Sequence, residues 1–292
     1  MKPIIYAVFG LLIATSCKNN KAAEIAQNDT AQIPTATFIT ETLGLTHCES
    51  AVYDAKQDII YASLIGEKEP GDGAIATIDL NGKLIDSLFI SGLNDPKGIA
   101  ITQDKLYVSD INELVEADLK TGKIIKKYSH DGLEFLNDVA IDGHGNVYVS
   151  DTGTSKIYQL DTQGNFNLWL ADENLDRPNG LLVQNNTMYV ASWGSQPNGG
   201  RVSKIDMTTK DMDSLTTIIG NLDGIRPYDK DRLIISDWTS GMIHLVDNDG
   251  NTQQVLQVGQ SVGDIAYIKE KKLLLLPMNK QSRLLFYKLE GF

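Results

Sequence analysis

The stretch RPNGLLVQNNTMYVASWG, residues 177–194, places a Pro-Asn-Gly turn directly before an apolar run, then a polar turn, then a second apolar run. Short runs bounded by turn residues and rich in β-branched and aromatic residues are typical of paired antiparallel strands. Similar stretches recur along the chain, each opening with a polar lead residue: Glu49, Lys97, Asn137, Asn179, Asp223 and Asp264. The lead residues are 48, 40, 42, 44 and 41 positions apart, which indicates a sixfold internal repeat.

Each repeat predicts four short strands. A second apolar run follows the first, as in VYVSD at 147–151, and a third ends at an Asp-containing turn, as in LDTQG at 160–164. Four such strands repeated six times predict an all-β fold, a six-bladed β-propeller over residues 36–292. The last repeat lacks one strand. Because an open ring would leave strand edges unpaired, we expect ATFITETLGL, residues 36–45, to join the C-terminal blade as its outer strand.

The N-terminus has the layout of an export signal. Lys2 precedes the apolar run 4–14, which is too short to span a bilayer, and small residues then lead to Cys17. This pattern resembles the lipobox of bacterial lipoproteins, although an ordinary secretory signal with a chance cysteine is the alternative. We expect a signal peptide at 1–16, a lipidated Cys17, a flexible tether at 17–35 and a lipid-anchored location in the cell envelope.

The charge balance limits the partners. With 26 Lys and Arg against 38 Asp and Glu, the chain carries a formal net charge of −12, which argues against nucleic acids and anionic membrane surfaces. We expect a monomer that binds a small molecule and touches a membrane only through its lipid. Apart from Cys17, the only cysteine is Cys48, so we expect a fold without disulfides.

The lead residues predict a cation site. In a propeller the first strand of each blade lines the central channel, so the six lead residues should converge at one mouth. Carboxylate and amide oxygens are the ligands that calcium prefers, and no thiolate and imidazole set suited to zinc is present. Turn formation is the competing explanation, because Asn-Gly and Asp-Gly are also common turn dipeptides.

The repeats resemble the SMP-30/gluconolactonase/LRE-like family of six-bladed propellers, and more distantly the paraoxonases and strictosidine synthases. The matching segments are THCESAVYD with Glu49, FLNDVAID with Asn137, RPNGL with Asn179 and NLDGI with Asp223. The resemblance implies that these four residues hold a divalent metal and that Asp223 also acts as a general base. Phe135 stands where many sugar lactonases carry an Arg that contacts substrate hydroxyls, which argues against a gluconolactone-like substrate.

These residues favour metal-assisted hydrolysis of a lactone or related ester. Calcium, or else zinc or manganese, would polarise the carbonyl while Asp223 or Asp264 takes a proton from the attacking water. The expected substrate contacts are Lys97, Phe135, Trp193 and Trp238.

Two other interpretations stay open. The first is a non-enzymatic binding propeller with a structural metal, because the VYVSD-like runs also resemble NHL repeats. The second is a Cys48 nucleophile beside His47, which is disfavoured because neighbours in an extended segment point to opposite faces.

Overall fold

The computed structural model describes residues 34–67 and 69–292. The predicted signal peptide, Cys17 and all but the last two residues of the predicted tether lie outside the described residues. Within the described part of the chain, no helix is long and apolar enough to cross a membrane.

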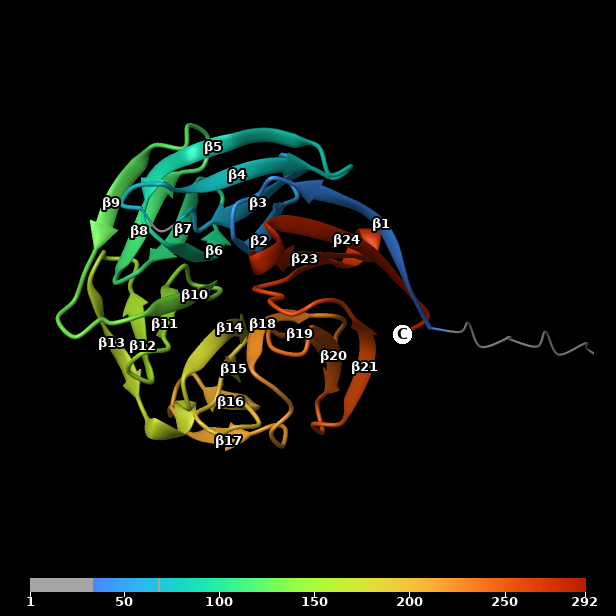
Figure 1. Cartoon of the computed structure of the whole chain (residues 1–292). Helices are drawn as coiled ribbons and strands as arrows, with labels where there is room; N and C mark the ends of the chain where they lie inside the picture. The colour runs from blue at the N-terminus through green and yellow to red at the C-terminus, as the bar shows by residue number, and fades with distance from the viewer. Residues whose placement is uncertain (1–33, 68) are drawn as a thin grey trace, which may run out of the picture. The chain divides into compact units, whose positions relative to one another are not determined.

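Six four-stranded antiparallel sheets surround a common centre, as blades do in a propeller (Figure 1). The first three blades consist of β2 (Cys48–Asp54), β3 (Ile59–Leu64), β4 (Gly73–Asp79) and β5 (Leu84–Leu93); β6 (Pro96–Ile101), β7 (Lys105–Asp110), β8 (Glu113–Asp118) and β9 (Ile124–Tyr128); and β10 (Leu136–Ile141), β11 (Val147–Asp151), β12 (Lys156–Leu160) and β13 (Phe166–Ala171). The next two consist of β14 (Pro178–Gln184), β15 (Thr187–Ser192), β16 (Val202–Asp206) and β17 (Met212–Ser214); and β18 (Leu222–Pro227), β19 (Arg232–Asp237), β20 (Met242–Asp247) and β21 (Thr252–Gln257).

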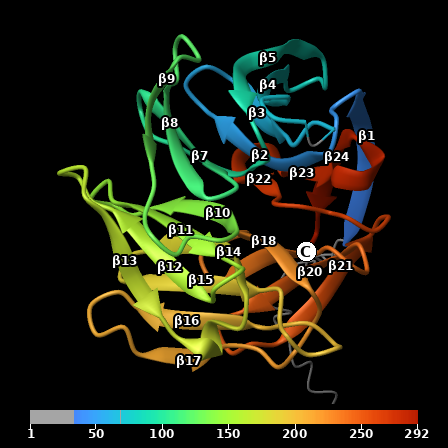
Figure 2. The same ribbon diagram turned by 60° about the vertical axis from the view of Figure 1, so that its left-hand side comes forward.

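The sixth blade closes the ring. It consists of β22 (Ala266–Ile268), β23 (Leu273–Met278), β24 (Arg283–Glu290) and, outermost, β1 (Thr35–Leu43), which pairs antiparallel with β24 (Figure 2). Three short 3-10 turns complete the elements: η1 (Glu173–Leu175), η2 (Lys269–Lys271) and η3 (Asn279–Gln281). The predicted six-bladed propeller and its closure by the N-terminal strand are both confirmed.

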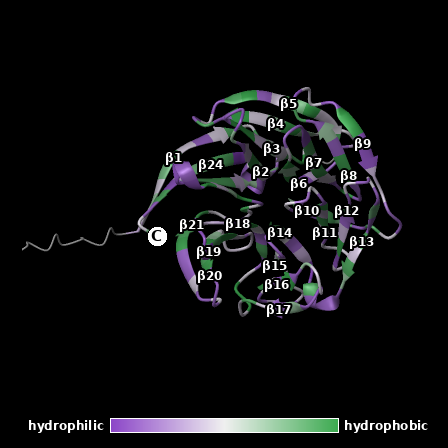
Figure 3. Cartoon of the chain, turned by 180° about the vertical axis from the view of Figure 1, so that it is seen from behind, coloured by the Kyte–Doolittle hydropathy of each residue, from purple (hydrophilic) through white to green (hydrophobic). Residues whose placement is uncertain are grey.

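Burial explains why the second strand of a blade, such as β11, is a continuous apolar run in the sequence. β11 is buried along its whole length, because sheets of neighbouring blades cover both of its faces, so it is a continuous apolar run ending in Ser-Asp. The outer strand β9 is exposed except at its last residue. Figure 3 shows the result: much of the hydrophobic colouring lies along the strands, and the hydrophilic colouring is frequent in the loops.

The Asp-containing turns link the third and fourth strands of a blade. Asp161 shows the mechanism, since its Oδ1 accepts hydrogen bonds from the backbone N–H groups of Gln163 and Asn165, both at 2.9 Å. Gly164 completes this turn with a φ of +86°, a conformation that glycine adopts without a steric penalty. The Asp and Gly residues of these turns therefore serve to form the turn.

Candidate functional site

Five of the six lead residues occupy the same place in their blades. Each is the second residue of the innermost strand, and each is buried: Glu49, Lys97, Asn137, Asn179 and Asp223. The innermost strands surround the centre of the ring (Figure 1). All five side chains line one cavity of about 490 Å³, so the structure brings them together as predicted.

The sixth lead residue, Asp264, does not line this cavity. Leu222, the residue before Asp223, pairs with Asp237. The corresponding pair in the last blade is Val262 with Met278. The residue equivalent to Asp223 is therefore Gly263, and Asp264 lies one position farther along. A shift of one residue in a strand turns the side chain to the other face. Our repeat alignment was thus one residue out in this blade.

Gly263 has no side chain because there is no room for one. A Cβ built on Gly263 would lie 2.1 Å from the carbonyl oxygen of Glu49. The N–H of Asp264 donates to that same oxygen at 2.8 Å, and Ser50 and Asp264 form a parallel bridge. The first and last blades thus meet backbone to backbone where the ring closes.

This close approach gives a stability prediction. We expect Gly263→Ala to lower the free energy of unfolding by about 1–3 kcal/mol, because the methyl group forces the two blades apart. Gly143→Ala is the matched control, since a Cβ at Gly143 meets no atom within 4 Å. Urea unfolding measures both variants. Equal midpoints would show that the two blades are not in contact at Gly263.

The repeated Ser-Asp pairs hold the lead residues in place. The hydroxyl of Ser150 accepts a hydrogen bond from the N–H of Asp138 at 3.0 Å and donates to the carbonyl of Asn179 in the next blade at 2.7 Å. The carboxylate of Asp151 accepts from the N–H groups of Glu134 and Phe135, at 3.0 and 3.1 Å. The loop entering β10 is thereby fixed, a role that sequence inspection missed.

The amides of two lead residues are oriented by their neighbours. The Nδ2 of Asn179 donates to the carbonyl of Leu222 at 3.2 Å, and the Nδ2 of Asn137 donates to the hydroxyl of Thr152 at 3.3 Å. These bonds use the amide donors and leave the oxygens free to accept. The Oδ1 of Asn179 and the Oε2 of Glu49 are buried and have no hydrogen-bond partner among the described residues.

Two buried carboxyl groups in the cavity have strongly perturbed pKa values. Burial raises the pKa of Glu49 well above its usual value, the charge of Asp223 raises it further, and Lys97 partly offsets both. Burial likewise raises the pKa of Asp223, as do the charges of Asp264 and Asp138. A cation held nearby would favour the charged form of both groups.

The donor set fits a hard cation. Ligands of an ion that is bound through oxygen are expected to be buried acceptors that receive no hydrogen bond. Buried carboxyl groups also fit, because a cation stabilises their charge. No group of three or more His, Cys, Asp or Glu residues in the described part of the chain is arranged to hold a metal. The four predicted ligands include only two such residues, so the remaining donors would be the amide oxygens of Asn137 and Asn179.

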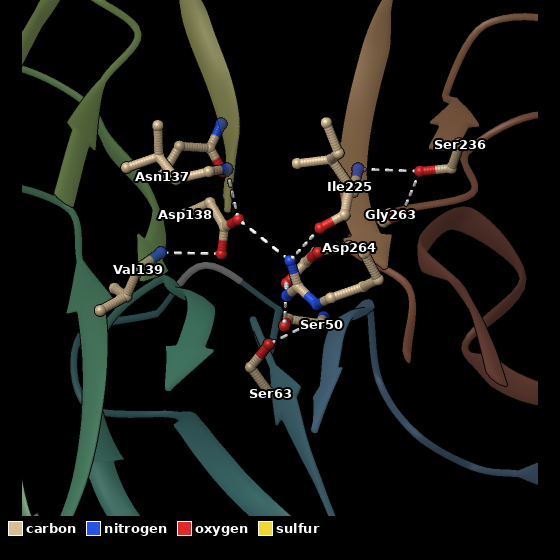
Figure 4. A network of polar contacts seen from close by, with 12 residues as sticks. Ser50, Ser63, Asn137, Asp138, Val139, Ile225, Ser236, Gly263 and Asp264 are labelled. Atoms are coloured by element: carbon tan, nitrogen blue, oxygen red, sulfur yellow. Dashed lines mark hydrogen bonds and ion pairs between the residues drawn. The ribbon is translucent and has the colours of Figure 1, made fainter. Parts of the chain in front are cut away.

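An ion-pair network connects Asp264 with Asp138, the residue after the lead residue Asn137. The guanidinium of Arg226 lies 2.5 Å from Oδ2 of Asp264 and 3.4 Å from Oδ2 of Asp138. The hydroxyl of Ser50 also donates to Asp264 at 2.8 Å. Figure 4 shows Asp138, Asp264 and Ser50 within this network of polar contacts. Although burial opposes the charged form, these two carboxylates raise the pKa of Arg226.

The predicted substrate contacts form two walls of the cavity. On one side the ammonium of Lys97 pairs with Asp95 and lies 4.8 Å from the ring centroid of Phe135. On the other side the rings of Trp193 and Trp238 are 6.3 Å apart and tilted by 58°.

Asn221 connects the two tryptophans. Its Nδ2 donates to the carbonyl of Trp193 at 3.0 Å, and its own carbonyl accepts from the N–H of Trp238 at the same distance. Sequence inspection gave no signal for this residue.

Arg177 and Lys280 also line the cavity, and the sequence did not single them out. The other polar residues of the lining are His47, Asp95, Thr152 and Asn279. Arg177 and Lys280 come from a loop and a short turn outside the strand repeat, so the periodic pattern carried no information about them. The neighbour of His47, Cys48, is buried, and burial raises the pKa of its thiol, which argues against a thiolate nucleophile.

No protein-family model and no curated protein sequence matches this chain. Several solved structures are similar. A gluconolactonase from Xanthomonas campestris, described as important in glucose secondary metabolic pathways, has a TM-score of 0.67 at 15% identity over 88% of this chain and 89% of its own. A streptogramin B lyase has a TM-score of 0.64 at 11% identity, over 88% of this chain and 98% of its own.

A virginiamycin B lyase from Staphylococcus aureus has a TM-score of 0.63 at 11% identity, over 88% of this chain and 99% of its own. These similarities support the propeller fold. Because identities are this low and the proteins differ in activity, the function has to be argued from the site itself.

Proposed function

We propose that this protein is a metal-dependent hydrolase of a lactone or related ester. The observation that carries the proposal is a pair of buried oxygens, on Glu49 and Asn179, that have no hydrogen-bond partner among the described residues and belong to a cavity that Asp223 also lines. Leaving buried acceptors unsatisfied costs stability, so their retention at one point favours a ligand that they bind. The gluconolactonase among similar structures is compatible with this chemistry.

The residues of this chain have separate roles in the proposed reaction. Glu49, Asn137, Asn179 and Asp223 would hold the cation, with calcium the best match to their oxygens. When bound, the cation would polarise the substrate carbonyl and stabilise the oxyanion.

Asp223 acts as the general base, because its buried carboxylate lines the same cavity as the other three proposed ligands. Asp223 takes a proton from water as the water oxygen bonds to the carbonyl carbon. The same proton passes to the leaving oxygen as the ester bond breaks. Asp264 is no longer assigned this role, because it is paired with Arg226 outside the cavity.

The cation site makes a pH-dependent prediction. Since the folded, cation-free protein holds protons on Glu49 and Asp223 more tightly than the unfolded chain does, its stability should fall as pH rises from about 4 through the raised pKa values. Calcium replaces those protons, so the increase in Tm on adding calcium should be larger at about pH 8 than at about pH 5. At a hundredfold excess over Kd, the stabilisation should be about 2.7 kcal/mol.

Thermal unfolding with calcium and with chelator measures this effect. The control is Glu49→Gln with Asp223→Asn, which should reduce the pH slope and remove the response to calcium. A lactone and aryl-ester panel with calcium, zinc or manganese then tests catalysis. Calcium stabilisation without turnover by any metal would replace the hydrolase with a binding propeller that contains a structural metal.

A further inference from the structure

Three acidic side chains, Glu49, Asp95 and Asp223, and three basic ones line the cavity. The cavity is lined by Lys97 from the second blade, Arg177 just before β14 and Lys280 in η3. Lys97 is paired with Asp95, but the charged groups of Arg177 and Lys280 have no ion pair or hydrogen bond with any described residue. Arg177 and Lys280 are exposed at the cavity, and in a protein of net charge −12 they provide counter-charges there for an anionic ligand.

Aromatic side chains occupy the same cavity. Trp193 and Trp238 are both only partly buried, and Phe135 is 39% exposed. Partly exposed aromatic faces that line a cavity provide a surface for a planar apolar group. Asn221 fixes the backbone of both tryptophans, so this surface is formed in advance. The volume of about 490 Å³ lies within the range of small-molecule sites, ~300–1,000 Å³.

The buried acids define where each part of the ligand lies. Glu49 and Asp223 balance the charge of the proposed divalent cation, so a further anionic group finds its counter-charge at Arg177 and Lys280. The reacting carbonyl is uncharged and reaches the lead residues. The apolar ring then contacts Trp193 and Trp238.

We propose that the substrate is an anionic lactone or ester that carries a planar apolar ring. This proposal rests on the proposed hydrolase function, and it specifies the substrate class for the same cavity. Arg177 and Lys280 recognise the carboxylate or other anionic group, and the tryptophan pair recognises the ring.

The test uses two lactones that differ only in charge, γ-(4-carboxyphenyl)-γ-butyrolactone and its neutral 4-carbamoyl analogue, in calcium-containing buffer. We expect kcat/KM to be at least about tenfold higher for the carboxylate at low ionic strength, with the preference declining as salt is added. In Arg177→Gln/Lys280→Gln the ratio of the two kcat/KM values should approach one. Lys230→Gln is the control, because this lysine is 87% exposed and does not line the cavity.

A binding measurement separates this proposal from the hydrolase proposal. Calorimetry compares 3-phenylpropanoate with 3-phenylpropanamide, neither of which contains an ester. If no lactone is hydrolysed but the carboxylate binds at least about tenfold more tightly, and Arg177→Gln/Lys280→Gln removes the difference, the ligand class stands and the hydrolase fails.

Two other outcomes overturn the proposed substrate class. If both lactones are hydrolysed with equal kcat/KM, the hydrolase stands and the anionic substrate class is wrong. If there is neither turnover nor a preference for 3-phenylpropanoate, both proposals fail.

Discussion

Arg226→Met should lower the free energy of unfolding by about 3–5 kcal/mol, because it leaves two buried carboxylates without their counter-ion. The side chains of Asp138 and Asp264 are only 1% and 2% exposed, and Arg226 is the positive charge that both contact. Burial raises the pKa of Asp264, and the charge of Asp138 raises it further. The charge of Arg226 opposes this increase. The loss should therefore be larger at neutral pH than in acid, where the carboxyl groups become protonated.

Chemical unfolding of matched variants measures this effect. Arg283→Met is the control, because Arg283 pairs with Glu41 at 2.9 Å but their side chains are 35% and 32% exposed. An exposed pair of this kind contributes about 0–1 kcal/mol. Adding Asp264→Asn to Arg226→Met should restore part of the stability by removing one unpaired charge. If Arg226→Met costs no more than Arg283→Met, the network does not hold the blades together.

Asp223→Asn should reduce turnover of any lactone substrate by about 10²–10⁴-fold, the contribution expected of a general base. The variant should stay folded, because asparagine has nearly the same shape and removes a carboxylate that Asp264 and Asp138 repel. More calcium should not restore the activity, because added calcium can compensate for a lost metal ligand but cannot replace the missing proton acceptor.

Glu49→Gln provides the matched comparison at the same cavity. It removes one ligand charge but no proton acceptor, so calcium affinity should fall and activity should return at higher calcium concentration. Steady-state assays over a calcium titration, with calorimetry on both variants, distinguish the two roles. If both variants recover at high calcium, Asp223 is a ligand only. If Glu49→Gln binds calcium as the unaltered protein does, the assignment of the cation site is wrong.

The sequence alone determined the fold, because the information that specifies a blade is local. Alternating apolar strands, Asp-containing turns and a repeat of constant length can be read within any one blade, and the missing strand predicted how β1 would close the ring. The same repeat predicted that Glu49, Lys97, Asn137, Asn179 and Asp223 share one cavity.

Only the tertiary structure decided how the last blade meets the first. The sequence LQVGQSVGDIAY has no feature that distinguishes Gly263 from Asp264 as the lead position. The register is set by Val262 pairing with Met278 and by the close approach of Gly263 to Glu49, more than 200 positions away in the chain. Register depends on the partner strand, so a strand's own sequence leaves it open by one residue.

The same limit applies to the charges around the cavity. Arg226 lies 88 positions from Asp138 and 38 from Asp264, and no local pattern relates the three. Arg177 and Lys280 belong to a loop and a short turn, where side-chain direction follows from closure of the ring rather than from strand periodicity. Local periodicity thus specified which strands form and which of their lead residues meet, and long-range packing decided which other polar side chains join them.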